Sequence, residues 1–166
     1  MTSSWFENSM KALDRAERFT PGGAQTMSRR SRNWPVGGHP LYLSKGLGPR
    51  VWDVDGNEYV DWNCALASMT LGYQNQEIVD AVSRTVGEPS FTLPNPLEAK
   101  VAEKMCSFIP CAEMVRFVKT GSEAAEAAVR IARAATNRDV VLSAGYHSWH
   151  STFQVLSLDH PGVPES

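Results

Sequence analysis

The chain has 166 residues and carries 16 lysine and arginine residues against 18 aspartate and glutamate residues. This length can bury one hydrophobic core, and the near balance of charge gives no indication of a polyanionic or membrane-surface partner. No apolar run approaches the roughly 20 residues that span a membrane, and the N-terminus lacks the basic-then-apolar order of a signal peptide.

The first predicted element is a helix close to the N-terminus. Ser3 or Ser4 can cap it, and the apolar residues between this cap and about Arg18 recur on one face of a helix. Pro21-Gly22-Gly23 then ends the helix. The segment that follows, residues 25–38, is expected to be a loop.

This loop carries three arginines within four positions, Arg29, Arg30 and Arg32. Exposed arginines in a loop are usually solvated surface residues. A guanidinium group is also the usual side chain for gripping a carboxylate through two parallel hydrogen bonds. The residues alone leave both interpretations open.

A compact β-meander is predicted next, with strands over residues 41–43, 50–54 and 58–62. β-Branched and aromatic residues, which favour strands, are frequent in these segments. Asp55-Gly56 lies between the last two strands and is a strong signal for a hairpin turn. Lys45 is expected in a glycine-rich turn between the first two strands.

Two helices with clear start signals follow the meander. Asn75 can cap the first helix, over residues 77–86. Asn95 can cap the second helix, in which Pro96 occupies the first helical position and Glu98 completes a capping box. Apolar residues in the second segment keep the spacing of a helix face.

A strand, a very tight turn and an alanine-rich helix come next, and they form the most informative stretch of the chain. Residues 114–118 are apolar and partly β-branched, as in a strand. Gly121 ends this strand. Thr120 stands three residues before Glu123, which is the spacing of a capping box, and strong helix formers continue through Ala135.

The start of this helix is a candidate phosphate site. A helix that opens on Gly121-Ser122 leaves backbone N–H groups without partners and points the positive end of its dipole outward, which suits an anion. The alternative is an ordinary capped helix after a buried strand, and such helices are common. The turn taken alone does not decide between the two.

Residues 139–142 are predicted to form a further short, buried strand, and the order strand, helix, strand indicates a parallel βαβ crossover. The loop 145–150, with the sequence Gly-Tyr-His-Ser-Trp-His, follows the carboxyl end of that strand. Ligands bind at this position in open α/β sheets. A planar, phosphorylated ligand would need both an anion cradle and a flat aromatic surface such as this loop offers.

No metal site is expected. His147 and His150 lie three residues apart, but no acidic or thiol partner is placed nearby. The three cysteines are an odd number without metal-ligand spacing, and reduced thiols fit a cytoplasmic protein best. A run of the form G-x-x-x-x-G-K-[ST], which would indicate a nucleotide-phosphate binder, is absent from the sequence.

Several motifs in order along the chain resemble the class III, fold-type I pyridoxal-phosphate aminotransferases, and among them the branch that contains glutamate-1-semialdehyde aminomutase. These motifs are residues 19–23, 51–61, 71–73, 120–124 and the loop 145–150. The resemblance covers nearly the whole chain and implies an α/β fold.

In that fold, residues 1–70 would contain the N-terminal helix, the loop and the small β-meander. Residues 71–166 would begin the large domain that binds pyridoxal phosphate and would contribute a parallel βαβ unit to its sheet. The resemblance also implies a homodimer, in which the N-terminal helix and the loop after it pack partly against the partner subunit.

The resemblance assigns roles to individual residues as well. Thr120, Gly121 and Ser122 would hold the phosphate of pyridoxal 5'-phosphate through backbone N–H groups and the Ser122 hydroxyl. Tyr146 would stack on the pyridine ring, with His147 beside it. The implied reaction moves an amino group on a small amino/keto or aldehyde substrate, as in a transaminase or an aminomutase.

Two further positions compare with the family. Arg29 falls where the aminomutase branch has an arginine that grips the substrate carboxylate. Ser148 stands where a glycine is usual. With Trp149-His150 after it, the loop looks more like that of the aminomutase-like transaminases found with sugar or polysaccharide synthesis.

The chemistry of such enzymes needs an amine that forms a Schiff base with the cofactor. None of the five lysines is placed for this role, and in the family that lysine lies further along than this chain extends. We therefore expect the N-terminal portion of a longer enzyme, inactive by itself. The alternative is a stand-alone, non-catalytic protein derived from the family that binds phosphate or forms dimers.

Overall fold

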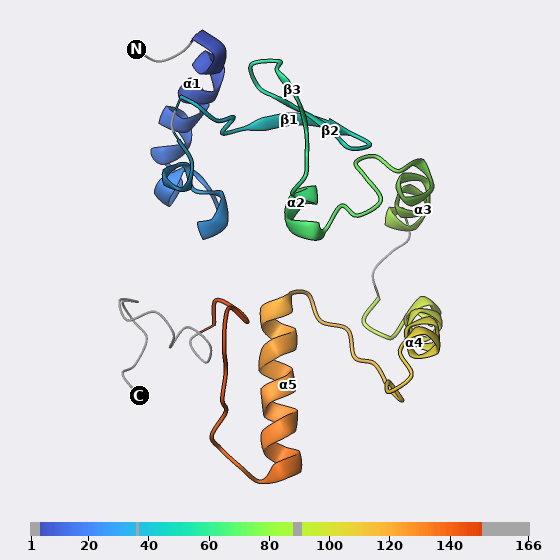
Figure 1. The fold of residues 1–166 in the computed structure, drawn as a ribbon. Coiled ribbons are helices and arrows are strands. Elements are labelled where there is room, and N and C mark those ends of the chain that lie inside the picture. The colour runs from blue at the N-terminus through green and yellow to red at the C-terminus, as the bar shows by residue number, and fades with distance from the viewer. Residues whose placement is uncertain (1–3, 36, 88–90, 151–166) are drawn as a thin grey trace. The chain divides into compact units, whose positions relative to one another are not determined.

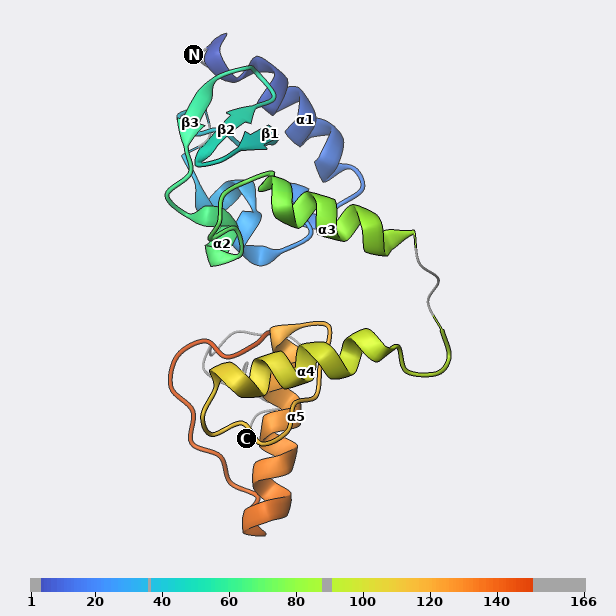
Figure 2. The same ribbon diagram turned by 90° about the vertical axis from the view of Figure 1, so that its right-hand side faces the viewer.

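The computed structural model describes residues 4–35, 37–87 and 91–150 (Figures 1 and 2). Two compact units make up the chain, Met1–Ser90 and Phe91–Ser166. These units are defined by contacts within this chain, whereas the predicted boundary after residue 70 concerns the domains of a complete enzyme. That boundary stays a prediction.

The first unit combines helices with one three-stranded sheet. Its helices are the 3₁₀ turns η1 (Ser4–Phe6), η2 (Pro21–Gly23), η3 (Met27–Arg29) and η4 (Ser31–Asn33) and the helices α1 (Glu7–Glu17), α2 (Cys64–Ala67) and α3 (Gln76–Val86). Its strands are β1 (Leu43–Leu47), β2 (Arg50–Asp53) and β3 (Glu58–Val60), in the order β1-β2-β3 and antiparallel. The described part of the second unit contains α4 (Pro96–Phe108) and α5 (Gly121–Thr136).

The N-terminal helix is confirmed, but its cap does not come from a neighbouring serine. The carboxylate of Asp55, in the turn between β2 and β3, accepts hydrogen bonds from the N–H groups of Asn8 at 2.6 Å and Ser9 at 3.0 Å. A negative charge stabilises the start of a helix in this position. Ser9 and Leu13 form the buried face of α1. The helix is thus attached to the meander of its own chain.

The β-meander is confirmed, with its first strand later in the chain than predicted. Lys45 lies within β1 instead of a turn, pairs with Trp52 on β2, and holds its Nζ atom 4.6 Å from the centre of the Trp52 ring. Gly46 is needed because a Cβ atom there would come within 2.5 Å of the Tyr73 ring. Gly46, which suggested a turn, therefore lies within a strand, where it leaves room for the Tyr73 ring to pack closely.

Asp53 is the buried anchor of the hairpin between β2 and β3, and it is 1% exposed. Its Oδ1 atom accepts hydrogen bonds from the N–H groups of Asp55 at 2.9 Å and Asn57 at 2.8 Å. Its Oδ2 atom accepts from Asn57 Nδ2 and the Tyr59 hydroxyl, both at 2.9 Å. Asn57 Nδ2 also donates to the Trp5 carbonyl at 3.0 Å, which links the network to the N-terminal segment.

The network shifts the pKa values of its acidic groups. Burial raises the pKa of Asp53, but the hydrogen bonds from Asn57, Tyr59 and Asp55 outweigh burial and hold that pKa below its ordinary value. The pKa of Asp55 is lowered in the same way, because donors at the start of α1 outweigh burial. Burial and the bond to Asp53 raise the pKa of Tyr59 to about 12.

These shifts predict how the stability of the first unit depends on pH. A carboxyl group with a lowered pKa stabilises the folded state above its unfolded pKa, and this contribution is lost as the pH falls through the folded value. The free energy of unfolding should therefore be level near neutrality and fall below about pH 4. It should fall again from about pH 10 towards 12 as Tyr59 ionises.

Urea unfolding of the chain at a series of pH values, followed by circular dichroism, measures this profile. The Asp55→Asn variant is the control, because its acid branch should be shallower than that of the wild-type chain. A midpoint that does not change as the pH is lowered through about 4 would contradict the role of the carboxylates.

α2 is a left-handed turn. Its four residues have φ values of 49°, 51°, 60° and 64° and none is glycine. Such backbone costs roughly 1–2 kcal/mol for each L-residue, so the sequence pattern gave no reason to expect it. The turn follows β3 directly and lies in the loop between β3 and α3.

The helices α3, α4 and α5 confirm the predicted start signals. The Asn75 side chain accepts from the N–H of Ile78 at 3.3 Å. The Asn95 side chain accepts from the N–H of Leu97, and Glu98 accepts from the Asn95 N–H at 3.1 Å, which completes the box. Within the described ranges, no helix has both the length and the apolar character needed to cross a membrane.

The two predicted strands on either side of α5 are not formed. Within residues 91–150 neither 114–118 nor 139–142 is a strand, so the predicted parallel βαβ pair is not observed there. Met114, Val140 and Leu142 are 91%, 84% and 96% exposed, not buried. A strand requires a neighbour that exchanges backbone hydrogen bonds with it, and the described part of this unit provides none. The apolar pattern identified segments that suit a sheet, but not the strands that would pair with them.

Candidate cofactor site

The start of α5 is fixed by the predicted capping box. Thr120 Oγ1 accepts a hydrogen bond from the N–H of Glu123 at 3.2 Å, and Glu123 Oε2 accepts from the N–H of Thr120 at 2.9 Å. The same Oε2 atom also accepts from the N–H of Lys119 at 2.8 Å. This third bond was not predicted, and it extends the cap to Lys119, the residue before Thr120. The backbone around the turn is therefore held by side chains of its own segment.

Two N–H groups at this helix start remain for a ligand. The cap uses the N–H of Glu123, whereas within the described residues the N–H groups of Gly121 and Ser122 have no hydrogen-bond acceptor. Gly121 is exposed and Ser122 is 9% exposed. The helix is 16 residues long, so its dipole is fully developed. The pair of donors lies at the positive end of that dipole.

Gly121 is not required by the protein's own structure. A Cβ atom placed on it would meet no atom of the described residues within 4 Å, and its backbone does not lie in the left-handed region. Gly145 differs, because its φ of +81° favours glycine for conformational reasons. The open space over Gly121 therefore suits a group from outside the chain that approaches the backbone closely.

The loop 145–150 returns to the same end of α5. Asn137 ends the helix in a left-handed conformation, and the Arg133 side chain donates to the Asp139 carbonyl at 2.8 Å, which turns the chain. The segment then runs back along the helix, so that the orange-to-red loop lies at the level of the helix start in both views (Figures 1 and 2). The predicted phosphate-binding turn and the predicted aromatic loop thus both lie at the N-terminal end of α5.

Within this loop the predicted ligand residues have different surroundings. Tyr146 is 81% exposed, so one face of its ring is free of protein over most of its area. His147 Nε2 lies 2.7 Å from the Ala144 carbonyl oxygen. Ser148, in place of the usual glycine, is buried, and its hydroxyl accepts from the N–H of His150 at 3.2 Å. The serine therefore closes a local turn.

The three arginines of the N-terminal loop are distinguished by their contacts. Arg30 is half-buried, and its side chain lies over Gly22, where a Cβ atom would be 3.1 Å from the Arg30 Cδ atom. Arg29, at the end of η3, and Arg32, in η4, are exposed. Arg30 therefore has a packing role, and Arg29 and Arg32 keep their guanidinium groups at the surface of the first unit.

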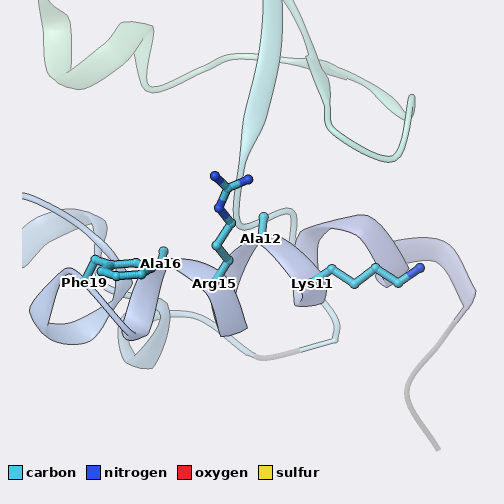
Figure 3. A pocket seen from close by; sticks show the side chains of 5 residues that line it. All are labelled: Lys11, Ala12, Arg15, Ala16 and Phe19. Atoms are coloured by element: carbon cyan, nitrogen blue, oxygen red, sulfur yellow. The ribbon is translucent and has the colours of Figure 1, made fainter.

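A hollow of about 440 Å³ lies along α1 and the residues just after it (Figure 3). Its lining is Lys11, Ala12, Arg15, Ala16 and Phe19. None of the predicted cofactor or substrate residues lines it. The hollow therefore shares no lining residue with the candidate site at the start of α5.

Comparison with known proteins identifies the family. The profile of the class-III aminotransferases matches residues 33–161. The chain belongs to this family, whose members depend on pyridoxal phosphate, and the predicted resemblance is confirmed.

Individual relatives agree with this result. The chain is 39% identical to a 3-aminobutyryl-CoA aminotransferase of Cloacimonas acidaminovorans, with 86% of this chain and 34% of the relative covered. It is 36% identical to the glutamate-1-semialdehyde 2,1-aminomutase of Persephonella marina, with 96% and 40% covered. A solved transaminase with PLP bound superposes with a TM-score of 0.83 at 31% identity, over 95% of this chain and 39% of that one.

Two conclusions follow from these relatives. The α/β, fold-type I class is confirmed, because the structural likeness covers nearly the whole chain. The chain also spans only about a third to two-fifths of the length of the curated relatives that it matches, and it corresponds to an N-terminal part of them. The activity of a whole enzyme is therefore a matter for proposal.

Proposed function

We propose that the chain is the cofactor-phosphate-binding, N-terminal portion of a transaminase or aminomutase that moves an amino group on a small amino/keto or aldehyde substrate. The observation that carries the proposal is the pair of N–H donors at Gly121 and Ser122 at the start of a 16-residue helix, with open space beside Gly121 among the described residues. The complete protein would be a cytoplasmic homodimer, and activity would belong to it alone.

The residues at the start of α5 fit the phosphate of pyridoxal 5'-phosphate. A phosphate ester carries about −1.5 to −2 charges at neutral pH and needs close, oriented donors. Gly121 and Ser122 would supply backbone N–H groups, and the hydroxyls of Ser122 and Thr120 would add donors. Thr120 already accepts the Glu123 N–H, and this leaves its hydroxyl proton free to be donated.

The loop 145–150 supports the other half of the proposal. Tyr146 would stack on the pyridine ring, and its exposed ring is compatible with that role. His147 would lie beside the ring, oriented through its contact with the Ala144 carbonyl. When bound, the cofactor supplies an electron sink that the protein's own side chains lack.

Arg29 would bind the substrate carboxylate. Its exposure at the end of η3 supports this role, because a guanidinium group without a packing function can form two parallel hydrogen bonds with a carboxylate. Arg30 is less suited, since its side chain covers Gly22. The matched pair Arg29→Lys and Arg32→Lys would separate the two remaining candidates by their effect on KM for a carboxylate substrate.

The contacts of three of the five lysines support the proposal that the lysine bonded to the cofactor lies in the remainder of the enzyme. Lys11 forms an ion pair with Glu7, and its Nζ atom lies 2.6 Å from the carboxylate. Lys45 and Lys104 hold their Nζ atoms 4.6 Å from the centres of aromatic rings. Each of these three amines has a local partner.

Replacing Ser122 with alanine tests the proposal. The change removes one charge-assisted hydrogen bond, worth roughly 1.5–3 kcal/mol, so affinity for pyridoxal phosphate should fall by roughly ten- to a hundredfold. Titration of the folded protein with pyridoxal phosphate, followed by tryptophan fluorescence, measures this affinity.

Ser107→Ala is the matched control, because the Ser107 hydroxyl bonds only the Lys104 carbonyl on α4. It should bind the cofactor as the wild-type protein does. If Ser122→Ala and wild type bind with equal affinity, the turn is structural only. That outcome would favour the alternative of an ordinary capped helix.

A further inference from the structure

We propose that Asp61 and Tyr73 are positioning residues that hold residues 64–67 in their left-handed turn, and that the turn relaxes when their contact is removed. Four consecutive non-glycine residues with positive φ are strained, and strained backbone persists only where the surrounding structure over-determines it. The groups around this turn show how it is held.

Asp61 holds the start of the turn. One of its carboxylate oxygens accepts from the N–H groups of Asn63 at 2.9 Å and Cys64 at 3.1 Å, and the other accepts from the N–H of Ala65 at 3.2 Å. Three successive backbone donors thus converge on one side chain. The bonds from Asn63 and Cys64 are those of an ordinary helix N-cap and fix the entry to the turn. The Ala65 N–H follows Cys64, the first left-handed residue, so this third bond connects the carboxylate to the left-handed backbone.

Further bonds close the turn. Asn63 Oδ1 accepts from the N–H of Leu66 at 2.6 Å, and the Ser68 hydroxyl donates to the Ala65 carbonyl at 2.7 Å. The Met69 N–H donates to the Cys64 carbonyl at 2.9 Å. All of these acceptors and donors belong to residues 63–69, so they close the turn without fixing it to the rest of the unit. Asp61 makes that connection.

Tyr73 fixes Asp61. Its hydroxyl donates to the Asp61 carboxylate at 2.6 Å. Its backbone exchanges two hydrogen bonds of 2.9 Å with Gly48, and its ring lies against Gly46 of β1. The sheet therefore fixes the ring, the ring fixes the carboxylate, and the carboxylate fixes the turn.

Two variants of the full chain test this sequence of contacts. Glycine adopts positive φ without strain, so Ala65→Gly should raise the thermal midpoint by about 2–4 °C. Tyr73→Phe keeps the ring against Gly46 and removes only the hydroxyl. It should lower the midpoint and shift the backbone J-couplings of residues 64–67 away from left-handed values in NMR spectra.

The double variant Ala65→Gly, Tyr73→Phe shows whether Tyr73 positions the turn or only stabilises the unit in general. If Tyr73→Phe releases the turn, Ala65→Gly should give little or no further stabilisation in that background. Ala24→Gly is the matched control, because Ala24 has an extended backbone with φ −152°, so glycine there relieves no strain and should lower the midpoint.

Two results would overturn the proposal. One is that Ala65→Gly lowers the midpoint as Ala24→Gly does, which would mean that the turn is not left-handed in solution. The other is that Tyr73→Phe leaves the couplings of residues 64–67 unchanged. Neither result depends on cofactor binding, so the proposed function is tested separately.

Discussion

Replacing Gly121 with valine is expected to lower affinity for pyridoxal phosphate by more than about a hundredfold, with little change in thermal stability. A branched side chain would occupy the open space over the helix start and keep a phosphate from both the Gly121 and Ser122 N–H groups. Loss of two charge-assisted hydrogen bonds exceeds about 3 kcal/mol. Since a Cβ atom there meets no atom within 4 Å in the part of the chain that the structure describes, the fold should accept the change.

Cofactor titration and thermal unfolding of the same preparation measure the two effects. Gly87→Val is the matched control, because Gly87 follows α3 with a right-handed φ of −73° and, among the described residues, a Cβ atom there would have a single neighbour, at 4.0 Å. That variant should bind the cofactor normally. A Gly121→Val protein that keeps its affinity would disprove the phosphate site.

Asp53→Ala is expected to give the largest loss of stability in the first unit. The substitution leaves four half-buried donors without their acceptor, from the Asp55 and Asn57 backbone, the Asn57 side chain and the Tyr59 hydroxyl. Each unsatisfied buried group costs about 1–3 kcal/mol, and water entering the space will recover part of this, so a net loss of about 3–5 kcal/mol is expected.

Chemical denaturation of the chain measures this loss. Asp53→Asn keeps the acceptor for the two backbone N–H groups, so its loss should be smaller. Glu58→Gln on the same hairpin alters only an exposed ion pair with Arg50 and should change stability by less than about 1 kcal/mol. Equal effects of Asp53→Ala and Glu58→Gln would show that the buried network contributes little.

Features with local causes were predictable from the sequence. The caps at Asn95 and Thr120 depend on a partner three residues later, and both are found as expected. The Asp55-Gly56 turn also depends on residues close in the sequence, because Asp53 accepts from the N–H groups of Asp55 and Asn57. The Thr120 cap marks the helix start, and the resemblance to the aminotransferase family assigns Gly121 and Ser122 there to the phosphate, which stays a prediction.

Features with distant causes were not predictable. The need for glycine at position 46 within β1 depends on its contact with the Tyr73 ring, and the separate role of Arg30 depends on its contact with Gly22. The left-handed turn depends on Asp61, whose residue type alone gives no sign of that function. The segments 114–118 and 139–142 have the composition of strands, but pairing depends on neighbours that a local pattern does not contain.

The cap of α1 has a consequence for the order of events during synthesis. The carboxylate that completes this helix belongs to a residue 47 positions after the first N–H group that it binds. At roughly 5–20 residues per second, the ribosome adds that residue several seconds after the helix itself. A short helix without its cap is marginal in water. α1 must therefore wait for a later segment of the chain before it becomes stable.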